Sequence, residues 1–172
     1  MVSAVGQSVP KPGLRPFLPA DTAICAAIFE ASINELTADD YTEGQREAWI
    51  AGLDEDTLAA KLGKQLTLIA TLREAPVGFA SLKDGNHIDF LYVHPSAVGH
   101  GVATALLDAL EKLALARGAT KLTAEVSDTA HRFFARRGYT DQTRNTVPRG
   151  NEWLANTTMQ KTLSATPKGT AQ

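Results

Sequence analysis

The chain has a single cysteine, Cys25, among its 172 residues. One thiol cannot form an intrachain disulfide, so a hydrophobic core must hold the fold together, as is usual in a reducing compartment. Cys25 lies in an apolar stretch with helical periodicity, where free cysteines pack as small apolar side chains. We therefore predict a buried, unreactive thiol in a cytoplasmic protein.

The sequence also lacks an excess of basic residues and any long apolar run. Its formal net charge is -2 and its pI is about 6.1, whereas nucleic-acid-binding domains carry a basic patch. No segment approaches the roughly 18 apolar residues of a membrane span. Residues 1–13 lack the charged start and apolar block of a signal peptide. We expect neither nucleic acid nor a membrane as a partner.

Motifs for metal binding and for covalent catalysis are missing as well. No histidines or acids have the spacing of a metal site, and one cysteine makes no zinc motif. The chain has no Gly-x-Ser-x-Gly sequence and no other convincing nucleophile. We therefore predict no metal, and direct transfer between bound substrates rather than an acyl-enzyme.

Helical and strand patterns alternate along residues 13–163. Three strands separated by turns predict an antiparallel meander, and the helix and strand that follow it predict a crossover with a parallel pair. The meander comprises Gln65–Leu72, Val77–Leu82 and His87–Val93, and the crossover comprises His100–Arg117 and Lys121–Val126. We predict one α/β domain over 13–163, with a mixed, mostly antiparallel sheet and flanking helices. A flexible segment, 1–12, and a disordered tail, 164–172, would enclose it.

Local signals supply the remaining boundaries. Leu14–Leu18 is predicted as the first strand, followed by helices with Asp21 and Thr42 as caps. A short third helix, started by Asp54, is predicted within Leu53–Leu62. The predicted hairpin turns are Glu74-Ala75-Pro76 and Asp84-Gly85. A short helix capped by Ser127 or Asp128 and two final strands complete the chain.

The segment 88–107 carries the strongest functional signal. A strand-like run ends at Pro95, and two glycines, Gly99 and Gly101, then open an amphipathic helix. The first N–H groups of a helix have no intrahelical partner, and the helix dipole adds partial positive charge there. Glycine allows the backbone to approach an anion closely. This pattern predicts a site for a phosphorylated ligand.

Two other interpretations of the glycine pair remain at this point. One is a tight turn without a ligand, since glycines are common at helix starts. The other is a dinucleotide site, with Glu125 as the acid that follows the next strand. Against the second interpretation, Thr104 replaces the third glycine, and the motif follows an antiparallel hairpin rather than a first βα unit.

The whole stretch Leu91-x-Val93-x-Pro95, Gly99-x-Gly101-x-Ala103 and Leu106-Leu107 closely resembles the acetyl-CoA site of the GNAT N-acetyltransferases. The later block from Ala130 through Phe133-Phe134 to Gly138-Tyr139 resembles the segment after that family's fifth strand. The resemblance covers roughly Leu14 to Leu163 and implies the GNAT fold. It also implies that main-chain groups of the strand pair with pantetheine and that the loop wraps the pyrophosphate: Leu91, Tyr92 and Val93, then Gly99, His100, Gly101, Val102, Ala103 and Thr104.

The resemblance has two departures. Val98 stands where the family usually has Gln or Arg, which should matter little to a cradle made of backbone groups. Phe134 stands where many members have a tyrosine that protonates the departing thiolate, and Ser127 stands where an asparagine is frequent. The general acid is therefore left open between water, Ser127, Tyr92 and unassisted departure.

A base must also take a proton from the acceptor amine, which is mostly ammonium at neutral pH. Asp89 and His87 lie two residues apart on one strand and therefore share a face. The resemblance implies that this strand carries the base in some members. A structural role for Asp89 and a solvated His87 are the alternatives, and Glu125 is a weaker candidate.

The resemblance places the acceptor near Thr37–Leu53 and Asn145–Asn156. The first region holds acids and aromatics that could face a cationic amine, and the favoured alternative is a solvated helix start, where the dipole stabilises acids: Asp39, Asp40, Tyr41, Glu43 and Trp49. Arg144, Arg149 and Glu152 would shape the other side. We predict acetyl transfer from acetyl-CoA to a primary amine of a small molecule or peptide, by a monomer or homodimer. The alternative is a catalytically weak acyl-CoA-binding module.

Overall fold

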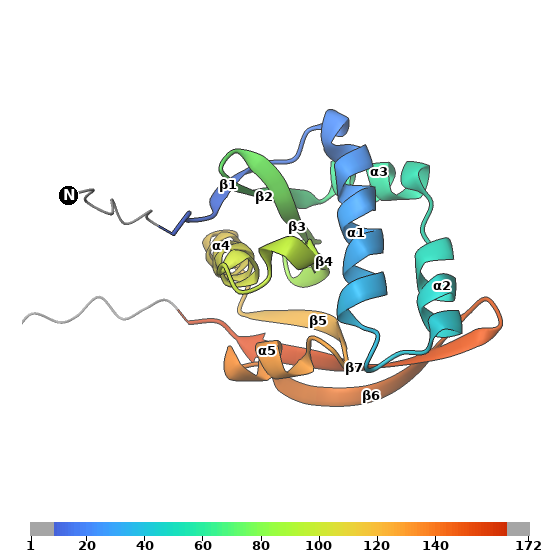
Figure 1. Cartoon of the computed structure of the whole chain (residues 1–172). Helices are drawn as coiled ribbons and strands as arrows, with labels where there is room; N and C mark the ends of the chain where they lie inside the picture. The colour runs from blue at the N-terminus through green and yellow to red at the C-terminus, as the bar shows by residue number, and fades with distance from the viewer. Residues whose placement is uncertain (1–8, 165–172) are drawn as a thin grey trace, which may run out of the picture.

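A computed structural model of the protein describes residues 9–164. Within these residues the chain forms seven strands and five α-helices, whose arrangement is drawn in Figure 1. In chain order they are β1 (Gly13–Pro16), α1 (Thr22–Leu36), α2 (Glu43–Ala51), α3 (Glu55–Lys64), β2 (Leu66–Leu72), β3 (Ala75–Lys83), β4 (His87–Val93), α4 (Val102–Ala116), β5 (Lys121–Ser127), α5 (His131–Arg136), β6 (Thr140–Arg149) and β7 (Glu152–Thr162). Single 3₁₀ turns, Pro19–Asp21 and Pro95–Ala97, precede α1 and α4.

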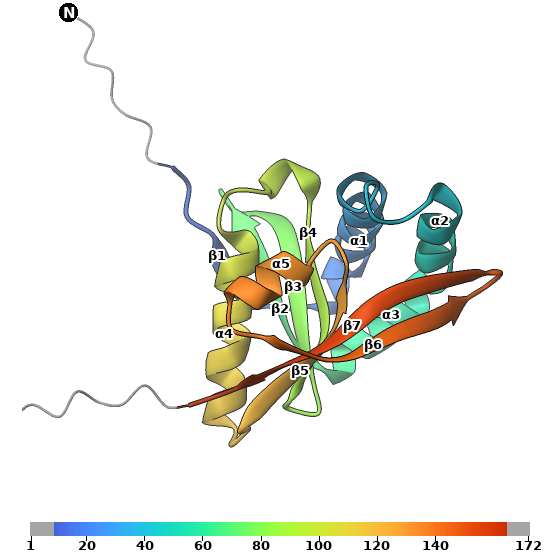
Figure 2. The same cartoon turned by 90° about the horizontal axis from the view of Figure 1, so that it is seen from below.

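The strands form one sheet in the order β1-β2-β3-β4-β5-β7-β6. Every neighbouring pair is antiparallel except β4 and β5, which the α4 crossover makes parallel, as predicted. That pair is short, because only His87 opposite Thr123 and Ile88 opposite Ala124 are in register. Beyond these residues the two strands separate (Figure 2). The predicted mixed, mostly antiparallel architecture is confirmed.

Helices cover both faces of the sheet (Figures 1 and 2). Each face buries a separate apolar cluster. On one face α4 and α5 cover a cluster that includes Leu106, Leu110 and Phe134. On the other face α1 and α3 cover a cluster that includes Ile33, Leu58 and the single cysteine. Cys25 is fully buried, and burial raises the pKa of its thiol to about 12. A thiol with so high a pKa is almost never a thiolate near neutral pH, so it lacks the nucleophilic form.

A one-residue register shift in β4 sets which side chains face which cluster. Ser81 of β3 pairs with Phe90, whereas its neighbour Leu82 pairs with Ile88, so Asp89 has no partner across the β3–β4 ladder. Ile88 packs in the α4 cluster and Phe90 in the α1 cluster, although simple alternation would place both on one face. The extra residue is the mark of a β-bulge, a feature that redirects side chains next to functional sites.

Gly78 allows the first turn of α4 to lie close to the sheet. A Cβ at this position would lie 2.9 Å from Val102 Cγ1 and 3.0 Å from the Tyr92 carbonyl oxygen. The first distance is shorter than real Cβ contacts and the second is at the tight limit, so a larger residue would require Val102 or the β4 backbone to shift. Gly78 carries no local signal in the sequence, because the need for glycine arises from a contact between β3 and α4.

Some predicted boundaries need correction. The turn assigned to Glu74-Ala75-Pro76 lies at Arg73 and Glu74, which have φ of 47° and 68°, and Pro76 is part of β3. Asp21 does not cap α1 with its side chain, because its carboxylate accepts two hydrogen bonds from Arg15 and one from the Leu18 N–H. Thr42 and Asp54 do cap α2 and α3, as predicted, by accepting from the N–H groups of Gln45 and Thr57.

The predicted flexible segment 1–12 and tail 164–172 fall outside the described residues, apart from 9–12 and 164. Among the helices of residues 9–164, none is long and apolar enough to cross a membrane.

Candidate functional site

The separation of β4 from β5 opens a cavity of about 390 Å³. Its walls come from the two strands, from α1 and α2 on one side, and from the starts of α4 and α5 on the other. The lining residues are Ser32, Leu36, Thr37, Trp49, Ile88, Asp89, Leu91, Tyr92, Val93, Val98, Ala103, Glu125, Val126, Ser127, Thr129, Ala130, Phe133 and Phe134. The strand before the glycine loop, the start of α4 and the Phe133-Phe134 block therefore meet at one place.

The predicted glycine cradle lies beside this cavity. Gly99 and Gly101 have φ of 87° and 78°, and Gly101 caps α4 in the left-handed conformation. The first helical bond runs from the Ala105 N–H to the Gly101 carbonyl (3.0 Å), so the N–H groups of Val102, Ala103 and Thr104 have no acceptor within the helix. A Cβ at either glycine would meet no atom within 4 Å, so the space above the loop is open. The geometry suits an anion such as a pyrophosphate.

Leu91, Tyr92 and Val93 present one free backbone edge to the cavity. They pair with Ala80, Phe79 and Gly78 of β3 on one side, and in the described chain they have no register partner on β5. The side chains of Leu91 and Val93 pack against the α4 cluster, and the Tyr92 ring lies against Phe29 and Phe79. The free backbone edge has the hydrogen-bonding groups that an extended, amide-containing chain such as pantetheine would need to pair with it as an added strand.

Asp89 lies on the cavity wall, and a chain of two hydrogen bonds fixes its carboxylate. Gln65 Nε2 donates to Asp89 Oδ2 (2.7 Å), and the Ser81 hydroxyl donates to Gln65 Oε1 (2.5 Å). Ser81 is fully buried and Gln65 is partly buried. Because Ser81 occupies the amide oxygen of Gln65, the amide nitrogen is directed at Asp89. The remaining carboxylate oxygen, Oδ1, accepts no side-chain hydrogen bond from residues 9–164 and is open to another partner.

His87 lies at the closed end of the strand pair. Its Nδ1 lies 2.7 Å from Thr123 Oγ1, its register partner on β5, and it does not line the cavity. The structure therefore brings Asp89, but not His87, to the cavity wall. A catalytic role for His87 stays a prediction that this geometry does not favour.

A second carboxylate, that of Glu125, lines the cavity from β5. Its Oε2 accepts hydrogen bonds from Thr158 Oγ1 (2.7 Å) and Asn145 Nδ2 (3.0 Å), which belong to β7 and β6. On β5 the side chains of Leu122, Ala124 and Val126 are buried in the α4 cluster, so Glu125 projects from the opposite face. The cavity thus has one carboxylate on each of its two separating strands.

Three side chains bear on the missing general acid. Phe134 lines the cavity and is buried, so no proton donor occupies the position where the resemblance implies a tyrosine. Burial raises the pKa of Tyr92, so its phenol gives up a proton less readily than an exposed tyrosine. The Ser127 hydroxyl accepts from the Ala130 N–H (3.1 Å) and also lines the cavity, which leaves its own hydrogen available.

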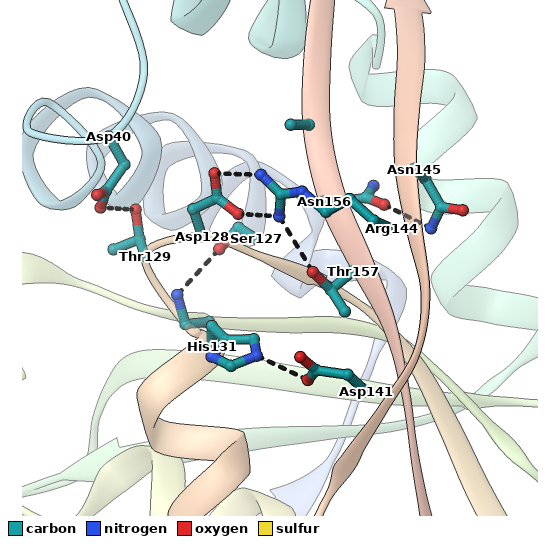
Figure 3. A network of polar contacts seen from close by, with 12 residues as sticks. Asp40, Ser127, Asp128, Thr129, His131, Asp141, Arg144, Asn145, Asn156 and Thr157 are labelled. Atoms are coloured by element: carbon teal, nitrogen blue, oxygen red, sulfur yellow. Dashed lines mark hydrogen bonds and ion pairs between the residues drawn. The ribbon is translucent and has the colours of Figure 1, made fainter.

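The predicted acceptor region is tied together by a network between the α1–α2 loop, the start of α5 and the β6–β7 hairpin (Figure 3). Arg144 donates two hydrogen bonds to the Asp128 carboxylate, at 2.5 and 3.0 Å, and one to Thr157 Oγ1. The two hydrogen bonds from Arg144 lower the pKa of the Asp128 carboxyl group. The Tyr41 hydroxyl accepts a hydrogen bond from the Asp128 N–H and donates one to the Ala155 carbonyl. Burial raises the pKa of the Tyr41 phenol.

Most acids predicted for the acceptor lie away from the cavity. Asp39, Asp40 and Glu43 are exposed and do not line it, and Asp40 accepts a hydrogen bond from Thr129. Trp49 does line the cavity and packs edge-on against Tyr41. Sequence reasoning missed Gln65, because a glutamine before a strand gives no signal until the fold shows its contact with Asp89.

Comparisons with known proteins agree with this geometry. The profile of the acetyltransferase (GNAT) domain family matches residues 37–163. The chain is 33% identical over 143 residues to the uncharacterized N-acetyltransferase YafP of Escherichia coli K12. The aligned residues cover 83% of this chain and 91% of the E. coli protein.

Solved structures give the same picture. A GCN5-related N-acetyltransferase from Rhodopseudomonas palustris, also named aminotransferase class II, superposes with a TM-score of 0.87 at 62% identity, over 92% of this chain and 100% of that one. The PaiA N-acetyltransferase of Thermoplasma acidophilum, in complex with coenzyme A, superposes with a TM-score of 0.73 at 18% identity, over 88% and 99%. The family profile and the identity to the E. coli protein show that this chain belongs to the GNAT family of N-acetyltransferases.

Proposed function

We propose that the protein transfers an acetyl group from acetyl-CoA to the nitrogen of a primary amine. The observation that carries the proposal is the cavity between β4 and β5, which a free strand edge, an open N–H cradle and the Asp89 carboxylate border together. Family membership supports an acyl-CoA substrate, and the Thermoplasma relative holds coenzyme A.

The donor would be held by backbone groups. The N–H and carbonyl groups of Leu91, Tyr92 and Val93 bind pantetheine along the free edge of β4. The pyrophosphate binds at the start of α4, where unpaired N–H groups and the helix dipole stabilise negative charge. The residues of this cradle are Gly99, His100, Gly101, Val102, Ala103 and Thr104.

Asp89 would act as the base. It takes one proton from the acceptor ammonium, which frees the nitrogen lone pair to attack the thioester carbonyl carbon. The new C–N bond forms and the C–S bond breaks, the nitrogen loses a second proton, and the sulfur gains one. The Ser127 hydroxyl or a water in the cavity protonates the sulfur and takes up the second proton from the nitrogen, because Phe134 has no proton to donate. The net reaction converts an ammonium and acetyl-CoA into an acetamide, free CoA thiol and one proton.

Two measurements test this proposal. Calorimetry should show binding of acetyl-CoA, and a panel of primary amines should give CoA release with acetylation of at least one amine. Binding without turnover of any amine would favour the acyl-CoA-binding module, an alternative that the buried Phe134 supports. Absence of acetyl-CoA binding at millimolar concentration would refute both functions.

Gln65 should matter to turnover but not to donor binding. In Gln65→Leu the carboxylate of Asp89 loses its hydrogen bond, so we expect kcat to fall about tenfold while KM for acetyl-CoA is unchanged. A tenfold effect corresponds to about 1.4 kcal/mol, at the lower edge of the range for a hydrogen bond to a charged group. Steady-state kinetics of the purified variant measure both constants.

A double-mutant cycle shows whether Gln65 acts through Asp89. In an Asp89→Asn background the further change Gln65→Leu should have little effect on kcat, because the group that it positions is gone. Independent, multiplicative losses would mean that Gln65 serves the fold instead. Gln65→Asn, which keeps an amide, should recover part of the rate if its shorter side chain still reaches Asp89.

A further inference from the structure

The two carboxylates of the cavity have no cationic partner among the described residues. Asp89 accepts from Gln65, and Glu125 accepts from Asn145 and Thr158, all of which are neutral donors. Several other acids are paired with a cation: Asp21 with Arg15, Asp128 with Arg144 and Glu111 with Lys161. The cavity therefore holds two negative charges that residues 9–164 do not balance.

Glu125 is also held in a defined position. Thr158 and Asn145 both bind its Oε2, and Asn145 is fixed in turn by the Asn156 side chain (2.9 Å). Its other oxygen, Oε1, accepts no hydrogen bond from the described side chains. A carboxylate fixed by neutral donors, with one oxygen free beside a cavity, is suited to bind a cation from solution.

Both carboxylates lie on the acceptor side of the sheet. Asp89 contacts Gln65, at the junction of α3 and β2, and Glu125 projects from the β5 face opposite the α4 cluster. The donor cradle lies at the start of α4. Acetyl transfer needs a single base, so one of the two carboxylates is left for another task. Two apolar side chains that also line the cavity, Leu36 and Trp49, offer contact to an alkyl chain.

We propose that Glu125 binds a second ammonium group of the acceptor, so that the preferred substrates are small alkyl diamines. Their reacting nitrogen lies at Asp89 and their second nitrogen at Glu125. This inference rests on the proposed acetyltransferase function and on Asp89 as its base. It makes Glu125 a specificity residue that leaves the acetyl-transfer steps themselves unchanged.

The test compares diamines with monoamines of the same length. The diamines are 1,3-diaminopropane, 1,4-diaminobutane and 1,5-diaminopentane, and each is paired with the monoamine in which a methyl group replaces one amine. Water screens an ion pair with an exposed carboxylate, so kcat/KM should favour the best diamine by up to about fivefold. In Glu125→Gln this preference should fall to near one, because kcat/KM for the diamine falls more than kcat/KM for its paired monoamine.

Glu30→Gln is the control, because it removes the same charge from an exposed position on α1. The diamine preference should survive in this variant. Wild-type turnover of monoamines without any diamine preference would refute the role of Glu125 and leave the proposed function intact. Equal loss of diamine and monoamine turnover in Glu125→Gln would also refute it, since Glu125 would then serve the chemistry. If no amine is acetylated, the proposed function fails, and the acceptor class fails with it.

Discussion

Asp89→Asn is expected to lower kcat/KM for a primary amine by about 10²- to 10⁴-fold, the usual contribution of a positioned general base. An alkylammonium resembles the lysine side chain, with a pKa near 10.4, so at pH 7.4 only about one molecule in a thousand is free base. Asparagine is close to aspartate in shape, and its side-chain carbonyl can still accept from Gln65, but it cannot take a proton. The substitution therefore removes the base and keeps the local packing.

Three measurements accompany this prediction. Calorimetry should give an unchanged Kd for acetyl-CoA, because the cradle and the β4 edge use backbone groups. The rate of Asp89→Asn should rise as the pH approaches the pKa of the amine, since solvent then supplies the free base. His87→Asn, which changes the other predicted base, should leave kcat/KM close to wild type. Comparable turnover by wild type and Asp89→Asn at neutral pH would exclude Asp89 as the base.

Gly101→Val is expected to raise the Kd for acetyl-CoA by about 10- to 100-fold. Gly101 has φ of 78°, a conformation that a β-branched residue adopts only with strain. The backbone would relax, which turns one or more N–H groups of the cradle away from the pyrophosphate. A hydrogen bond to a charged group contributes about 1.5–3 kcal/mol, so loss of one accounts for the expected change. Calorimetry with acetyl-CoA measures it directly.

Gly118→Val separates the cradle from general strain. Gly118 ends the same helix and has φ of 89°, and a Cβ added to it would likewise meet no atom within 4 Å. Both variants should lose similar stability in thermal melts, roughly 1–2 kcal/mol for a left-handed non-glycine residue. Only Gly101→Val should weaken acetyl-CoA binding. If both variants lose the same amount of acetyl-CoA affinity, the loss comes from impaired folding, and the cradle is not the pyrophosphate site.

The proposed donor half of the site was the more predictable half because its signals are local in sequence. A strand, two glycines with positive φ and an amphipathic helix adjoin one another between Ile88 and Ala116, and the structure places them as expected. The Asp84-Gly85 pair also predicted a turn. The structure confirms it, because both residues have positive φ. The turn near Pro76 was misplaced, because proline commonly marks a turn but here lies within β3.

The acceptor half was less predictable because its groups meet only across the fold. Asp89 and His87 are equivalent on an alternating strand, yet only Asp89 lines the cavity. Its partner Gln65 is 24 residues away in sequence, and the partners of Glu125 come from two later strands. The acids near Asp40 have the chemistry to face a cation, but they are exposed and outside the cavity. Periodicity assigns a residue to a face and says nothing of what lies opposite.

The sequence alone determined the order of the elements, the crossover that makes β4 and β5 parallel, and the glycine cradle at the start of α4. Each depends on the backbone preferences of adjacent residues, which act over a few positions in any context. Tertiary structure decided where β4 and β5 part, the register shift that leaves Asp89 unpaired, and the meeting of Asp89 and Glu125 at one cavity. These features arise from packing between residues far apart in the chain, such as Gly78 against Val102, and such contacts exist only once the fold is formed.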